Sequence, residues 1–176
     1  MAVSGNYAYV AYEEAGLQVI DVSNPSNPVR VGRFFTANGY SLGVTVSGNH
    51  AYVANEAGGL LVIDVSRPAS PVLVGGYDTL GYANGVALSG NYAYLADDEA
   101  GLQVIDVSNP TNCVRVGRYN TSGRAWGVAV VGARIYVADG DAGLLVLPSL
   151  PNLQHTLRID ATPNIPLKEA THWNRC

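Results

Sequence analysis

The sequence predicts an all-β fold built from four copies of one four-stranded antiparallel unit. A Ser-Gly-Asn turn or a close variant recurs along the chain, short segments rich in Val, Ile and Tyr follow it, and prolines stand between these segments. The turn glycines lie 43, 42 and 42 residues apart, at Gly5, Gly48, Gly90 and Gly132. A period of about 40 to 45 residues fits either a four-stranded sheet or a pair of helices, so the local residues must decide.

The local residues favour strands. In the third copy the segments GVALSG, NYAYLA, GLQVIDVS and CVRVGRY are short, rich in β-branched and aromatic residues, and bounded by turn residues. Prolines recur at one position of successive copies, Pro25, Pro68 and Pro110, where they would break a helix but suit a loop. Each copy is therefore expected to hold four strands in up-and-down order.

Each strand of the unit has its own character. The first strand, as in GVTVSG, consists of small residues, which fits an innermost strand where converging sheets leave little room. The two middle strands are almost continuously apolar, as expected for a sheet that is covered on both faces. Tyrosine recurs in the second strand, at Tyr9, Tyr52, Tyr94 and Tyr136. Its ring is expected to fill the core between sheets. The fourth strand alternates and carries arginines, which suit an exposed outer edge.

Radial stacking explains why one chain repeats the unit, because a sheet with two apolar faces cannot bury both of them alone. The sequence therefore predicts a β-propeller of four up-and-down, four-stranded antiparallel blades over residues 1–162. The blades are expected at about 1–36, 37–79, 80–121 and 122–162, followed by a loose tail over 163–176. Residues 1–4 can supply the inner strand of the first blade, and residues 153–161 can supply the outer strand of the last. The four blades form either a closed ring or an excerpt of a larger propeller.

Three segments carry a family resemblance: GLQVIDVSNPSNPVRVG, GLLVIDVSRPASPVLVG and GLQVIDVSNPTNCVRVG. The chain resembles the LVIVD repeat of bacterial and archaeal propeller proteins from residue 1 to about 150. It is more distantly similar to the YVTN surface-layer propeller repeat, through AYVANEAGGLLVIDVS. The resemblance implies an extracellular or cell-surface protein without family-wide catalytic residues. The chain departs from the motif at Cys113, which replaces a linker proline, and at VLPSL in the fourth copy.

Composition excludes several classes of protein. Of the 176 residues, 48% are hydrophobic and 14% are charged, which is typical of a folded globular chain. The net charge of -4, with Lys168 as the single lysine, argues against a nucleic-acid partner. No membrane span or signal peptide is visible, because long apolar runs are absent and MAVSGNYAYV lacks a basic segment. Cys113 and Cys176 are expected to be free thiols.

Acidic residues gather in the hairpins between second and third strands. Eight of the fourteen acids lie there: Glu13, Glu14, Glu56, Asp97, Asp98, Glu99, Asp139 and Asp141. Hairpin tips select such residues in any case, so solvated turns are the simplest interpretation and no cofactor is expected. Calcium is the alternative, because clustered carboxylates supply hard oxygen ligands, although the frame of an EF-hand is absent. Its candidate ligands are Asp97, Asp98, Asp139 and Asp141.

A second set of acids ends the third strands. Asp21, Asp64 and Asp106 precede Val-Ser and a proline turn, where a carboxylate can accept backbone N–H groups. Equivalent positions are spread around a ring and do not converge on one substrate, so no catalytic residues are assigned. We therefore expect a non-catalytic scaffold or interaction module. The alternatives are a propeller hydrolase or lyase with a site at the central channel, and a purely structural segment of a longer surface protein.

Connectivity predicts which face binds a partner. In an up-and-down blade the second-to-third hairpin and the link to the next blade emerge at the same end, and these links vary while the framework barely changes. The predicted partner-binding residues are Tyr40, Tyr82, Asn84, Arg124 and Trp126 in the links and Glu56, Asp98 and Asp139 in the hairpins. The partner would be a protein or peptide, a basic one in particular, or a carbohydrate.

Two alternatives stay open. Tyr82 and Trp126 either belong to this binding surface or plug the central channel, because small propellers fill their interiors with side chains. A closed ring would be monomeric, whereas an excerpt would expose buried-type faces and self-associate.

Overall fold

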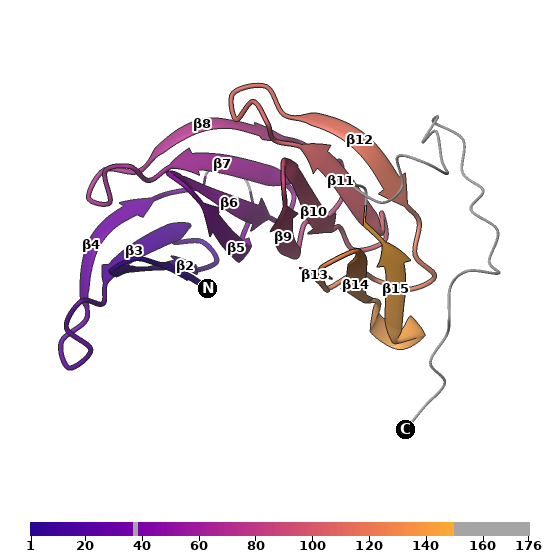
Figure 1. Ribbon diagram of the computed structural model, residues 1–176, viewed down its shortest axis with the longest axis horizontal. Coiled ribbons are helices and arrows are strands. Elements are labelled where there is room, and N and C mark those ends of the chain that lie inside the picture. The colour runs from indigo at the N-terminus through magenta and orange to yellow at the C-terminus, as the bar shows by residue number, and fades with distance from the viewer. Residues whose placement is uncertain (37–38, 150–176) are drawn as a thin grey trace.

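A computed structural model of the chain describes residues 1–36 and 39–149 and places four antiparallel sheets side by side along an arc (Figure 1). We call these sheets blades 1 to 4. Within each blade the strands follow in sequence order, so each strand pairs with the one before it. The predicted all-β propeller fold of up-and-down blades is confirmed.

Three blades have four strands, and the described part of blade 4 has three. Blade 1 contains β1 (Ala2–Ser4), β2 (Tyr7–Ala11), β3 (Leu17–Asp21) and β4 (Val29–Phe34). Blade 2 contains β5 (Ser41–Ser47), β6 (His50–Asn55), β7 (Leu60–Asp64) and β8 (Val72–Tyr77). Blade 3 contains β9 (Gly85–Ser89), β10 (Tyr92–Ala96), β11 (Leu102–Asp106) and β12 (Val114–Tyr119). Blade 4 contains β13 (Gly127–Val131), β14 (Arg134–Ala138) and β15 (Leu144–Pro148), with a short 3-10 helix at Gly140–Ala142.

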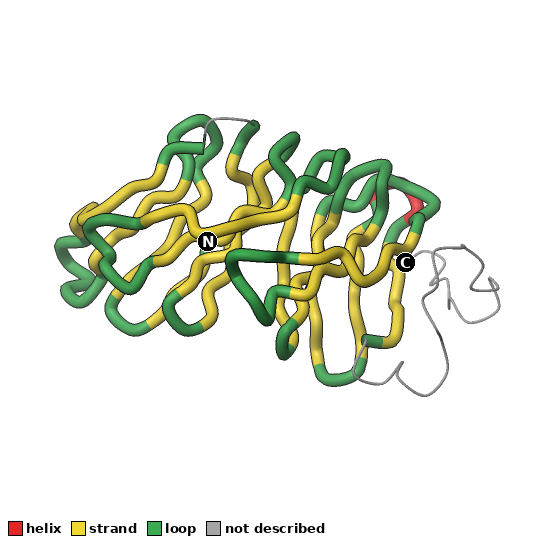
Figure 2. Tube along the Cα trace, turned by 90° about the horizontal axis from the view of Figure 1, so that it is seen from above, coloured by secondary structure: helices red, strands yellow, loops and turns green. Residues whose placement is uncertain are grey.

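The first strands of blades 2 to 4 (β5, β9 and β13) lie on the inner side of the arc, and the fourth strands of blades 1 to 3 (β4, β8 and β12) lie on its outer side (Figure 1). The inner strands of successive blades contact one another, β5 with β9 and β9 with β13. Small residues in these strands allow this close approach, as the sequence predicted. In the edge-on view of Figure 2 the loops gather along the two edges of the arc, with the strands running between them.

The core consists of three clusters, one between each pair of neighbouring blades. The tyrosine of the second strand belongs to this core in the first three blades, where Tyr9, Tyr52 and Tyr94 are 4%, 6% and 0% exposed. Burial raises the pKa of the Tyr9 and Tyr52 hydroxyls. The predicted core role of these rings is confirmed.

The turn aspartates order the loops that follow the third strands. The Asp64 carboxylate accepts the backbone N–H of Ser66 at 2.7 Å, and Asp21 and Asp106 make the same bond two residues ahead at 2.9 and 2.8 Å. These hydrogen bonds lower the pKa of all three carboxyls. The predicted structural role of the three aspartates is thereby confirmed.

The described blades form an open arc and not a closed four-bladed ring (Figure 1). Of the two predicted end strands, residues 2–4 form β1, whereas residues 153–161 and the predicted tail 163–176 lie outside the described part.

Candidate functional site

Hairpins and inter-blade links emerge together at one edge of the arc, which we call the loop face. The tip of each hairpin pairs through its backbone with the link that enters the next blade, which forms three bridges: Glu13 with Ser41, Glu56 with Ala83, and Asp98 with Ala125. Each bridge has two hydrogen bonds of 2.9 to 3.1 Å between backbone N–H and C=O groups. The predicted proximity of hairpins and links is therefore confirmed, and hydrogen bonds between backbone groups hold them together.

The position before the bridge acid is buried in blades 2 and 3, and so is its counterpart Asp139 in blade 4, whereas in blade 1 this position is Tyr12, which is 63% exposed. Where it is buried, its side chain holds the link that enters its own blade. Asn55, Asp97 and Asp139 are 1%, 0% and 3% exposed. Their hydrogen bonds come from Ser41 Oγ to Asn55 Oδ1 (3.1 Å), from Thr79 Oγ1 to Asp97 Oδ1 (2.8 Å) and from Gly123 N to Asp139 Oδ2 (3.0 Å). Asp139, one of the predicted partner-binding residues, is thus turned into the protein.

Asp97 has the most perturbed environment of the described acids. Burial raises the pKa of its carboxyl from 3.8 to about 6, although the hydrogen bond from Thr79 opposes the shift. Its second oxygen, Oδ2, is buried without a hydrogen-bond partner. A side chain at Gly81 would collide with this carboxylate, so the glycine leaves the room that Asp97 occupies.

Large side chains on the loop face remain in solvent. Tyr40, Tyr82 and Trp126 are 41%, 55% and 54% exposed. The described open arc has no closed channel (Figure 1), so the choice between a binding surface and a channel plug for Tyr82 and Trp126 stays a prediction. Leu80 is 93% exposed and has a positive φ of 61°, which a leucine rarely adopts. Asp78 stabilises this conformation by accepting the Leu80 N–H at 2.9 Å.

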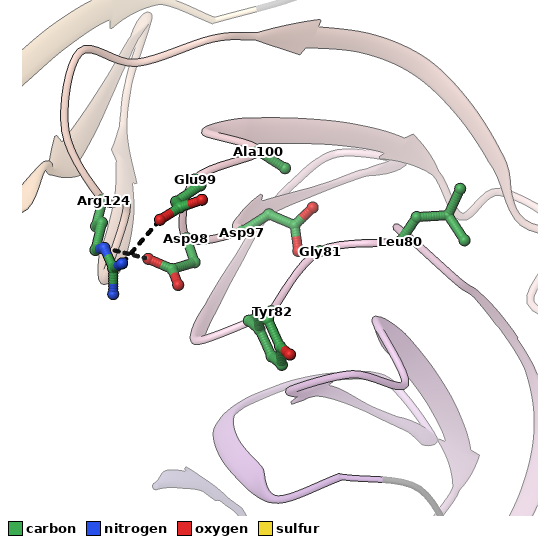
Figure 3. A pocket seen from close by; sticks show the side chains of 8 residues that line it. All are labelled: Leu80, Gly81, Tyr82, Asp97, Asp98, Glu99, Ala100 and Arg124. Carbon is green, nitrogen blue, oxygen red and sulfur yellow. Dashed lines mark hydrogen bonds and ion pairs between the residues drawn. The ribbon is translucent and has the colours of Figure 1, made fainter.

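A pocket of about 420 Å³ opens between the blade 3 hairpin and the neighbouring links (Figure 3). It is lined by Leu80, Gly81, Tyr82, Asp97, Asp98, Glu99, Ala100 and Arg124. Arg124 lies 2.8 Å from Glu99 and 3.8 Å from Asp98 and so spans both carboxylates at one side of the pocket, with Leu80 at the other side. Carboxylates outnumber cations in this lining.

The remaining predicted site residues lie on the same face. Tyr40 donates its N–H to Glu56 at 3.2 Å and its hydroxyl to Glu14 at 3.3 Å. The negative charge of Glu14 raises the pKa of the Tyr40 hydroxyl. Asn84 donates its side-chain amide to the Ala125 carbonyl at 3.1 Å, which gives it a structural contact between blades 3 and 4.

The predicted partner-binding residues did not include Leu80 or Glu99, although Glu99 was among the predicted hairpin acids. Glu99 is 74% exposed and forms the shorter ion pair with Arg124. The signal for Leu80 was its position between Thr79 and Gly81, in a link where a large apolar residue has no strand to support it. Its backbone conformation, however, follows from the hydrogen bond to Asp78 and is not visible in the residue pattern.

Calcium was the cofactor alternative for these hairpins. Among residues 1–36 and 39–149, no three His, Cys, Asp or Glu side chains are placed so that they could hold a metal ion. Asp97 and Asp139 face inward, whereas Asp141 is exposed. In the same described ranges, no helix is long and apolar enough to cross a membrane.

The blades and their shared loop face define a β-propeller repeat protein. The LVIVD repeat model matches residues 1–36, 38–79, 80–121 and 122–156. The chain therefore belongs to the LVIVD repeat family, and the predicted resemblance is confirmed. No curated protein sequence matches the chain significantly.

Solved structures show the same fold at low sequence identity. The computationally designed protein Ika8 matches with a TM-score of 0.67 and 9% identity, over 83% of this chain and 44% of that chain. Designed Ika4 matches with a TM-score of 0.66 and 11% identity, over 84% of this chain and 88% of that chain. BamB from Moraxella catarrhalis matches with a TM-score of 0.63 and 14% identity, over 84% of this chain and 43% of that chain. The chain thus spans less than half the length of Ika8 and of BamB.

Proposed function

We propose that this chain is a non-catalytic interaction module whose loop face binds a basic, amphipathic segment of a partner protein. The observation that carries the proposal is the exposure of Leu80 and Tyr82 in the lining of an acidic pocket, together with the exposure of Trp126 directly after the Asp98–Ala125 bridge. Large apolar and aromatic side chains beside a concave site are the usual anchors of protein interfaces. The unfavourable backbone of Leu80 supports the proposal, because such conformations concentrate at functional sites.

The bridges make the proposed surface continuous across blades 2 to 4. Glu56 pairs with Ala83, directly after Tyr82, and Asp98 pairs with Ala125, directly before Trp126. Exposed aromatic groups and partly buried carboxylates therefore lie next to each other at two successive joints, and the Asp98 side chain is 14% exposed. A partner with alternating basic and apolar residues has the chemistry to match both kinds of group.

A pair of peptides tests this function. A labelled peptide of about 18 residues made of Lys and Leu, and its Glu and Leu counterpart, are titrated with the protein by fluorescence anisotropy. The Lys peptide is expected to bind and the Glu peptide is not, with weaker binding as salt rises. Tyr82→Ala and Trp126→Ala should each weaken binding about tenfold. Val114→Ala is the control, because Val114 is similarly exposed, at 49%, on an outer strand.

Two results would contradict the binding surface. One is equal affinity for both peptides, which would remove the role of charge. The other is a large fall in melting temperature for Tyr82→Ala and Trp126→Ala with binding retained, which would give these side chains a core role. Circular dichroism of each variant supplies the melting temperature.

A hydrolase or lyase is the second candidate function, and Asp97 is the observation that favours it. A carboxyl with a pKa of about 6 in a pocket has the properties of a general acid or base. Against this function, the Asp97 side chain is completely buried and already holds Thr79, which supports a structural cause for the shift. Turnover of a glycoside or ester library that Asp97→Asn abolishes would favour the enzyme.

We propose an extracellular or cell-surface setting on the strength of the family resemblance alone. Antibody labelling of intact cells, with permeabilised cells as the control, tests it. Signal only after permeabilisation would contradict this setting.

A further inference from the structure

The two ends of the arc each leave one sheet face without a neighbouring blade in the described structure. At the end formed by blade 4, Leu144 is 45% exposed, whereas its counterparts Leu17, Leu60 and Leu102 are at most 1% exposed. At the end formed by blade 1, Val3 is 62% exposed. Both faces are apolar and lie apart from the loop face, and exposed apolar faces of this kind usually pack against another surface.

The free face of blade 4 repeats the face with which blade 2 packs on blade 3. Four positions carry identical residue types, Tyr136, Ala138, Leu144 and Val146 in blade 4 and Tyr52, Ala54, Leu60 and Val62 in blade 2. In blade 2 these four are 6% exposed or less, and they form one cluster with blade 3. In blade 4 Leu144 and Ala138 are exposed and the other two are half-buried.

The free face of blade 1 repeats the face of blade 3 that packs on blade 2. Its residues Val3, Ala8, Val10, Ile20 and Val22 correspond to Leu88, Ala93, Leu95, Ile105 and Val107 of blade 3. Leu95 and Ile105 are fully buried against blade 2, whereas Val10 and Ile20 are only half-buried. Each end of the arc therefore carries one half of an interface that already exists inside it.

We propose that a second copy of this chain supplies the missing halves, with blade 4 of each copy packing on blade 1 of the other. Such head-to-tail contacts close a ring when the rotation between copies allows it. The comparison with larger chains of this fold supports the arrangement, because this chain covers 44% of Ika8 and 43% of BamB, so each of those chains is a little more than twice as long as the part that this chain matches. Two copies of this chain would supply eight blades.

Size-exclusion chromatography with light scattering on the full chain tests the ring. Between about 1 and 100 µM the mass is expected to reach 37 kDa, twice the 18.5 kDa of one chain, and to fall on dilution. Leu144→Arg and Val3→Arg should each give 18.5 kDa with unchanged circular dichroism, because both side chains are exposed in the single chain. Leu73→Arg is the matched control and should stay at 37 kDa. Leu73 is also 45% exposed, and arginine occupies its position in blades 1 and 3.

Three outcomes would overturn the proposal. The first is a wild-type mass of 18.5 kDa throughout the concentration range. The second is a mass that grows beyond two copies, which would mean that the faces pair without closing a ring. The third is a dimer that Leu144→Arg breaks and Val3→Arg leaves intact, which would place blade 4 against blade 4.

Discussion

The replacement Asp97→Asn is expected to stabilise the protein at neutral pH and to remove a pH dependence. The pKa of Asp97 rises from 3.8 in its ordinary state to about 6 in the fold. The folded state therefore binds the proton more tightly than the unfolded state, and stability is full below about pH 4 and falls as the pH rises toward 6. At about 1.4 kcal/mol per pKa unit, the ionised carboxylate destabilises the fold by at most about 3 kcal/mol above that range.

Asparagine keeps the acceptor for Thr79 and carries no charge, and blade 2 already has Asn55 at this position. Its Nδ2 takes the place of the unpartnered Oδ2, and a buried unpaired amide costs about 1 kcal/mol or more. The net gain at about pH 7.5 is therefore about 1 to 2 kcal/mol, or a melting temperature higher by about 2 to 8 °C.

Urea unfolding followed by circular dichroism at about pH 4.5 and pH 7.5, at one fixed protein concentration, measures this gain. The variant should be more stable than the wild type at the higher pH only. A variant that is destabilised more at about pH 7.5 than at about pH 4.5 would refute the reasoning, because it would show that the carboxylate is favourably held in its ionised form.

Three further predictions concern the packing, the loop face and the turns. Gly75→Ala should lower the free energy of unfolding in urea by about 1 to 3 kcal/mol, because the new methyl group would collide with the Pro110 carbonyl. Gly127→Ala is the control, because its methyl group has room and should change the free energy of unfolding by less than about 0.5 kcal/mol, and equal effects of the two variants would contradict the packing argument. Arg124→Ala should tighten binding of the Lys and Leu peptide about threefold, because it frees two carboxylates, and weaker binding would show that Arg124 contacts the partner. Asp106→Asn should destabilise the protein at neutral pH, because the fold lowers the pKa of Asp106 and so favours its ionised carboxylate. The loss of stability should shrink as pH falls below the ordinary aspartate pKa, and a loss that is constant with pH would contradict the role of the charge.

The periodic part of the structure could be predicted from the sequence because it depends on local chemistry. Tyr94 and Leu102 recur in every copy, and apolar residues at fixed places in strands that are covered on both faces have to be buried. The hydrogen bond of Asp106 follows in the same way from its place before a Val-Ser turn.

The burial of Asp97 beside its neighbour Asp98 could not be predicted. The two residues have the same chemistry, and their different environments depend on the hairpin, in which Asp98 takes a positive φ of 46°. A strand irregularity between Val104 and Ile105, repeated in blades 1 and 2, also has no signal in the residue pattern. The sequence likewise could not decide between a closed ring and an open arc, because this depends on small rotations between blades that no single residue determines.

The backbone bridges of the loop face join each hairpin to the link that enters the next blade, and they do so whichever side chains the bridged residues carry. Glu56 and Asp98 hold the next link through their N–H and C=O groups, which every residue except proline possesses. Substitutions beside the bridges, at Tyr82 or Trp126, are therefore expected to leave the joints between successive blades unchanged. If the loop face binds a partner as proposed, this constant frame lets point mutations and the exchange of whole repeats produce new specificities.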